Sequence, residues 1–80
     1  MKVEVLGPGC QNCKTLAERV KRVAEEQGLE IDFDYIDEMD ELAERGIALT
    51  PALMVDGEAV VTGEVPSEDE IKEILQNQSD

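Results

Sequence analysis

The fold is decided near the start of the chain, where residues 3–13 read VEVLGPGCQNC. The apolar side chains of Val3, Val5 and Leu6 are typical of a short buried strand. The Gly-Pro-Gly at 7–9 stops that strand, because one proline between two glycines favours a turn. Cys10 and Cys13 follow, where the pattern becomes helical. The stretch therefore predicts a strand, a loop and a helix start, with two thiols at the junction.

Helical spacing of apolar residues continues from about residue 11 to 27. The positions that recur every three or four residues are Cys13, Leu16, Ala17, Val20, Val23 and Ala24. Gly28 suits the left-handed residue that ends a helix, and Leu29 is placed to cover that end. The segment predicts an amphipathic helix with Cys13 on its buried face.

Shorter strands and helices are predicted in the middle of the chain. Residues 31–35 alternate apolar and acidic side chains, which indicates a strand at a sheet edge with one wet face. A short helix follows, capped by Asp37 and closed by Gly46. Asp56-Gly57 predicts a type I′ turn, which would join residues 52–55 and 58–62 into a β-hairpin.

The chain ends on a third predicted helix. Residues 67–70 form a capping box, and apolar side chains up to Leu75 give this helix a buried stripe. Residues 76–80 lack apolar anchors, so we expect them to fray. The order βαβαββα predicts a single α/β domain over residues 1–80. Two right-handed crossovers and a hairpin would give a four-stranded mixed sheet with helices on both faces.

Composition excludes several classes of function. The 80 residues carry 20 acidic and 7 basic side chains, a net charge of −13, and no histidine. That charge repels phosphates, so we expect neither nucleic acid nor an anionic membrane as a partner. No apolar run reaches the roughly 20 residues of a membrane helix. The first residues lead directly into structured sequence without the pattern of a signal peptide, which indicates a cytoplasmic protein.

The acidic residues avoid the cysteines. Residues 1–27 carry five basic and four acidic side chains, whereas residues 28–80 carry two basic and sixteen acidic ones. A solvated acidic surface explains most of this asymmetry. Nearby negative charges oppose thiolate formation. The small number of acidic residues in the first segment therefore also suits a reactive cysteine.

The two thiols are predicted to be unequal. Cys10 falls at the first helical turn, where free N–H groups and the helix dipole stabilise an anion and lower the thiol pKa. Cys13 is in register with the buried face of the helix. This arrangement suits thiol–disulfide exchange, with Cys10 attacking a substrate disulfide and Cys13 resolving the mixed disulfide.

Three other roles for the cysteines remain open. A purely structural disulfide across so short a loop would contribute only about 2 kcal/mol. Two thiolates at this spacing also bind Cu(I) or share Zn, so a soft-metal chaperone is the main alternative. Small metal-carrier domains of that kind run βαββαβ, however, whereas this chain ends on a helix. A non-catalytic binding module is the third possibility.

The combined pattern resembles the minimal thioredoxin/glutaredoxin fold, and above all the small redox-active disulfide proteins of archaea and bacteria. The signature is VLGPGCQNCK at 5–14 together with Thr50-Pro51 before a strand. The resemblance implies an oxidoreductase that acts on protein disulfides or carries electrons between a reductase and a target. We expect the protein to be a monomer. The Cys10–Cys13 disulfide would be its only redox group, with no bound cofactor or metal.

The resemblance also implies a substrate-binding surface. Pro51 would be a cis-proline packed beside the dithiol, and the backbone of Thr50 would pair with an extended substrate segment. Gly9, Gln11 and Asn12 would contact the substrate next to the reactive thiol. Gly9 stands where thioredoxins usually carry tryptophan, and Gln11-Asn12 replaces their Gly-Pro.

A carboxylate in the first strand completes the candidate site. Thioredoxins carry a buried aspartate six residues before the first cysteine, and Glu4 stands six residues before Cys10. We hypothesise that Glu4 accepts the proton of Cys13 during resolution. The alternative is an exposed carboxylate at the strand end, paired with Lys2 or a neighbouring strand.

Overall fold

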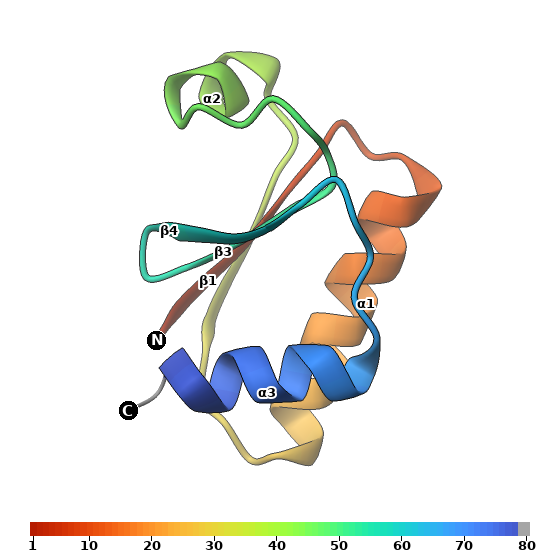
Figure 1. Ribbon diagram of the computed structural model, residues 1–80, viewed down its shortest axis with the longest axis vertical. Coiled ribbons are helices and arrows are strands. Elements are labelled where there is room, and N and C mark those ends of the chain that lie inside the picture. Colours follow the sequence, from red (N-terminus) through yellow and green to blue (C-terminus); the bar gives the residue numbers. More distant parts are fainter. Residues whose placement is uncertain (79–80) are drawn as a thin grey trace.

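The computed structural model describes residues 1–78 (Figure 1). In chain order its elements are β1 (Lys2–Leu6), α1 (Gln11–Glu26), β2 (Asp32–Ile36), α2 (Met39–Glu44), β3 (Ala52–Val55), β4 (Glu58–Thr62) and α3 (Glu68–Gln78). This is the predicted βαβαββα order. Within these residues, none of the helices is both long and apolar enough to cross a bilayer.

The four strands form one mixed sheet in the order β2-β1-β3-β4. β2 is an edge strand, as predicted, and β1 is a central one. β1 pairs with β2 in parallel and with β3 antiparallel. The prediction of two crossovers is therefore wrong, because only the first connection joins parallel strands. The six residues of α2 span about 9 Å, too short to return along a strand of about 17 Å, so β3 enters from the end where β2 stops.

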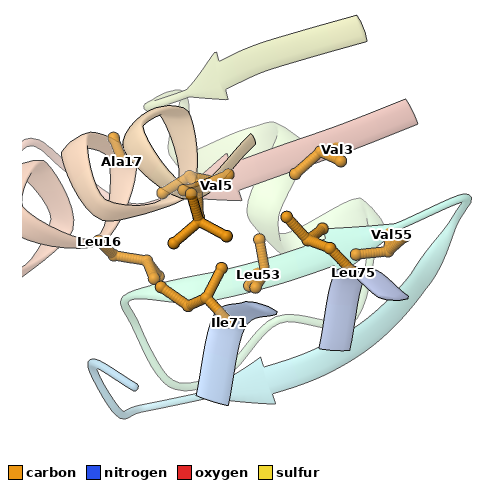
Figure 2. Close-up of a cluster of buried hydrophobic side chains, with 10 residues drawn as sticks. Val3, Val5, Leu16, Ala17, Leu53, Val55, Ile71 and Leu75 are labelled. Carbon is orange, nitrogen blue, oxygen red and sulfur yellow. The ribbon is translucent and has the colours of Figure 1, made fainter. Parts of the chain in front are cut away.

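Helices cover both faces of the sheet. α1 and α3 pack on one face, where Figure 2 shows side chains of both helices pointing at the strands: Leu16, Ala17, Ile71 and Leu75 against Val3, Val5, Leu53 and Val55. α2 lies on the other face, over a smaller cluster made of Leu6, Leu42, Ile47, Ala52 and Met54. Alternate residues of β1 thus belong to two different cores.

Most helix ends and turns follow the sequence signals. Gly28 has φ +66°, and the N–H of Leu29 donates to the carbonyl of Ala24 at 2.9 Å. Asp56 and Gly57 have φ values of +51° and +84°, as a type I′ turn requires. The Oγ of Ser67 accepts from the N–H of Glu70 at 3.2 Å, which confirms the cap of α3.

Two helix boundaries differ from the prediction. The N-cap of α2 is Glu38 rather than Asp37, because the N–H of Leu42 donates to the carbonyl of Glu38. α3 continues past Leu75 to Gln78, whereas we expected fraying from residue 76. Nε2 of Gln76 donates to Oε1 of Gln27 at 3.4 Å, which ties this turn to the end of α1. Residues 79–80 of the predicted frayed tail lie outside the described residues.

Candidate active site

The two cysteines form a disulfide at the start of α1, with their Cα atoms 5.1 Å apart. Cys10 is the N-cap of α1 and is exposed. Its Sγ accepts from the N–H of Cys13 at 3.2 Å, and its carbonyl accepts from the N–H of Lys14 at 3.0 Å. An amide N–H and the positive end of the helix dipole therefore face this sulfur, an environment that stabilises a thiolate.

Cys13 is completely buried, as its place on the helix predicts. A Cβ added to Gly7 would collide with Sγ of Cys13 and lie 3.0 Å from its Cβ. The N–H of Gly7 donates to the carbonyl of Ile36 at 2.9 Å, which fixes this glycine to β2. Gly7 therefore leaves the space that the second sulfur occupies.

The segment Thr50-Pro51 lies beside the same glycine. Its peptide bond is cis. Cβ of Thr50 lies 3.8 Å from the place where a Cβ of Gly7 would stand, so Gly7, Cys13 and Thr50 converge. Pro51 is buried, and its carbonyl accepts from the N–H of Gly63 at 2.9 Å. The Cys10–Cys13 disulfide and the cis-proline segment thus form one site.

The other residues expected to contact substrate surround Cys10. Gln11 and Asn12 are exposed on the first turn of α1. Gly9 has φ +90°, and an added Cβ would meet nothing within 4 Å. The surface beside Cys10 is consequently open on the side where thioredoxins usually carry tryptophan.

Glu4 lies on the face of the sheet away from the dithiol helix. Its neighbours Val3 and Val5 contact the core under α1, whereas Glu4 points to the α2 side and is 4% exposed. The carboxylate therefore lies on the face of the sheet opposite the one that the dithiol helix covers. The alternative of an exposed carboxylate paired with Lys2 is wrong, because Glu4 is buried and Lys2 pairs with Asp32, at 3.8 Å.

The partner of Glu4 is Arg45, which sequence reasoning missed. Nη1 of Arg45 donates to Oε2 of Glu4 at 2.6 Å, and its Nε reaches Oε2 of Glu41 at 3.5 Å. Burial by itself lowers the pKa of Arg45, but the hydrogen bond and charge of Glu4, with the charge of Glu41, outweigh it and raise the pKa. The sequence does contain a signal for this pair. A buried carboxylate needs a counterion, and residues 28–80 offer only Arg45 and Lys72.

The two sulfurs are the reactive groups that the structure brings together at this site. Within residues 1–78, no group of three or more histidine, cysteine or acidic side chains is arranged to hold a metal ion. An exposed sulfur at a helix start and a buried sulfur one turn later suit thiol–disulfide exchange, in which one thiol attacks and the other resolves the mixed disulfide.

The fold and this disulfide together define a thioredoxin-fold redox domain. A family model described as "Thioredoxin domain" matches residues 1–76. A thioredoxin of Methanothermobacter thermautotrophicus is 41% identical over 75 residues, which cover 94% of this chain and 97% of the relative. A thioredoxin of Methanocaldococcus jannaschii is 33% identical over 75 residues, covering 94% of this chain and 86% of the relative. The chain belongs to the thioredoxin family, and it is a thiol–disulfide oxidoreductase.

Proposed function

We propose that the chain reduces protein disulfides, with Cys10 as the nucleophile and Cys13 as the resolving thiol. The observation that carries this assignment is the unequal exposure of the two sulfurs. Cys10 is exposed and its Sγ accepts an N–H, whereas Cys13 is fully buried against Gly7. Only the first sulfur is accessible to a partner protein, and its environment favours the thiolate that attacks.

The reaction proceeds in two exchanges. The thiolate of Cys10 attacks one sulfur of the substrate disulfide; a new S–S bond forms, and the other substrate sulfur leaves as a thiolate. The thiolate of Cys13 then attacks Sγ of Cys10, which restores the Cys10–Cys13 disulfide and releases the second substrate thiolate. The dithiol loses two electrons and the substrate gains them. A reductase must return those electrons, with two protons, before the next cycle.

Substrate docking uses the segment beside the disulfide. The backbone of Thr50 pairs with an extended stretch of the substrate, and Pro51 packs against the dithiol. Gly9, Gln11 and Asn12 contact the substrate next to Cys10.

The protein works as a monomer in the cytoplasm, without a bound cofactor. Among residues 1–78 only two large hydrophobic side chains, Met39 and Leu49, are strongly exposed. Such isolated residues do not amount to the apolar patch of a stable dimer. A reducing compartment supplies the dithiol form that the reaction consumes.

Single-cysteine variants test the assignment. Cys13→Ser should accumulate a mixed disulfide between Cys10 and a disulfide-containing protein, visible on a non-reducing gel, because nothing resolves it. Cys10→Ser is the matched control and should trap nothing. Trapping by Cys10→Ser alone would reverse the roles.

Titration of the wild type in a glutathione redox buffer, repeated with Cu(I) and Zn(II), tests redox chemistry against metal binding. It should show a reversible dithiol transition. Tight stoichiometric metal binding without such a transition would contradict the redox function.

A further inference from the structure

The ion pair of Glu4 and Arg45 is a buried feature that the exchange reaction does not use directly. The side chain of Glu4 is 6% exposed and that of Arg45 is 28% exposed, and their charged atoms are 2.6 Å apart. A carboxylate at this depth requires a partner, because an unpaired interior charge is strongly unfavourable. The folded protein must therefore keep these two side chains together.

Glu4 is rigidly connected to the dithiol. It lies in the central strand β1, which is hydrogen-bonded to β2 on one side and β3 on the other. A short stretch of backbone leads from Glu4 to Gly7, against which Cys13 packs. The position of the carboxylate is thus fixed relative to the two sulfurs.

Arg45 is connected to the other half of the site. It is the C-cap of α2, and the residues that follow it, 46–51, lead directly to the cis-proline. Within this segment Ile47 is buried, whereas residues 48 and 49 are exposed. The stretch that presents Thr50 is therefore held at one end by Arg45 and the buried Ile47, and at the other end by Pro51.

Contacts on both sides define the direction of the Arg45 side chain. Nη1 of Arg45, which donates to Glu4, also lies 3.9 Å from Sδ of Met54. Nε of the same side chain faces Glu41. Met54 is the register partner of Glu4 across β1 and β3. The guanidinium consequently links the end of α2 to the two central strands.

We propose that the Glu4–Arg45 pair is a positioning device that holds segment 46–51 against the strand carrying the dithiol. It thereby sets the place of Thr50 for substrate docking. The inference rests on the proposed function of Thr50. It gives Glu4 a role other than proton acceptor for Cys13, since the carboxylate faces away from α1 and is occupied by the guanidinium.

The first test compares two substrates, a protein disulfide and hydroxyethyl disulfide, which is too small to need pairing with Thr50. Arg45→Met should lower kcat/KM for the protein disulfide about tenfold, through KM, and change the small-disulfide rate less than about twofold. Glu4→Gln should stay near wild type with both, because its amide oxygen still accepts from Arg45. Arg22→Met, which breaks the exposed pair with Glu68, is the matched control.

The two roles of Glu4 give opposite results. A proton acceptor would make Glu4→Gln slow with both disulfides and leave Arg45→Met active. That outcome, or equal loss of both activities in Arg45→Met, overturns the positioning role. If Arg45→Met does not fold because Glu4 is left unpaired, the double variant Glu4→Gln/Arg45→Met removes both charges and still lacks the link. It should show the same selective loss for the protein disulfide.

A second test is independent of activity. The amide of Gly63 donates to the carbonyl of Pro51, so its hydrogen exchange reports whether the segment stays docked. Loss of the pair should speed this exchange about tenfold relative to the amide of Leu29, which closes α1. Unchanged exchange of Gly63 overturns the positioning role. A wild type that reduces neither disulfide refutes the proposed function instead, and the exchange measurement still decides the position of the segment.

Discussion

Sγ of Cys13 packs so closely against Gly7 that a Cβ atom added to Gly7 would collide with it. Gly7→Ala should therefore push the buried sulfur away and destabilise the fold by about 2 kcal/mol, the usual effect of overpacking. It should also slow resolution of the mixed disulfide about tenfold, since the attacking atom is displaced. Urea denaturation measures the first effect, and stopped-flow reduction of a protein disulfide measures the second.

Gly28→Ala is the control for this substitution. A side chain at Gly28 is also unfavourable, because the φ of this residue is +66°, but an added Cβ would have no atom within 4 Å. It should lose about 1 kcal/mol through backbone strain alone and keep the wild-type exchange rate. If Gly7→Ala exchanges disulfides as fast as Gly28→Ala, the packing of the sulfur against Gly7 does not matter for catalysis.

The thiols of the reduced protein should differ in reactivity. Cys10 is exposed and caps α1, whereas Cys13 is completely buried. We expect iodoacetamide to modify Cys10 at least about tenfold faster than Cys13, because alkylation requires an accessible thiolate. Mass spectrometry of peptides from a timed, quenched reaction gives both rates. Equal rates in the folded protein would remove the basis for assigning Cys10 as the nucleophile.

Local features of this fold could be predicted because their causes are local. The left-handed glycine that ends α1, the Asp56-Gly57 turn and the Ser67 cap each depend on residues a few positions apart. The position of the dithiol could be predicted for the same reason, since residues 3–13 contain the patterns of the strand, the turn and the helix start.

Long-range relationships could not be predicted from such patterns. Glu4 and Arg45 are 41 residues apart, and no periodicity links them. The antiparallel entry of β3 depends on the length of α2 and on where β2 ends, which propensities do not specify. The sequence pattern predicts Gly7 only as a turn residue, whereas the structure needs a glycine there for the close approach of Cys13. In each case the missing information was a contact between distant segments.

The cap of α3 should contribute stability without affecting the chemistry. Ser67→Ala leaves the N–H of Glu70 without its side-chain acceptor and should lower the free energy of unfolding by about 1 kcal/mol. Ser67→Asp retains an acceptor and should stay near wild type. Urea denaturation of the three proteins tests the cap, and their disulfide-exchange rates should be indistinguishable. A change in exchange rate for Ser67→Ala would mean that the cap is coupled to the dithiol.

Leu49 should contribute to the docking of protein substrates. Its side chain is 62% exposed, directly before Thr50, and its Cβ would lie 3.2 Å from a Cβ added to Gly63. An exposed leucine at this place provides apolar surface that a substrate can cover. Leu49→Ser should therefore lower kcat/KM for a protein disulfide about fivefold, equivalent to about 1 kcal/mol, through KM.

Met39 provides the matched control for Leu49, because it is 65% exposed on α2. Met39→Ser should leave kcat/KM unchanged, and neither variant should alter the rate with hydroxyethyl disulfide or the free energy of unfolding by more than about 0.5 kcal/mol. Equal losses in both variants would indicate a general effect of surface hydrophobicity. A loss confined to Leu49→Ser would place substrate contact on the surface beside Thr50, because only that leucine adjoins the segment next to the dithiol.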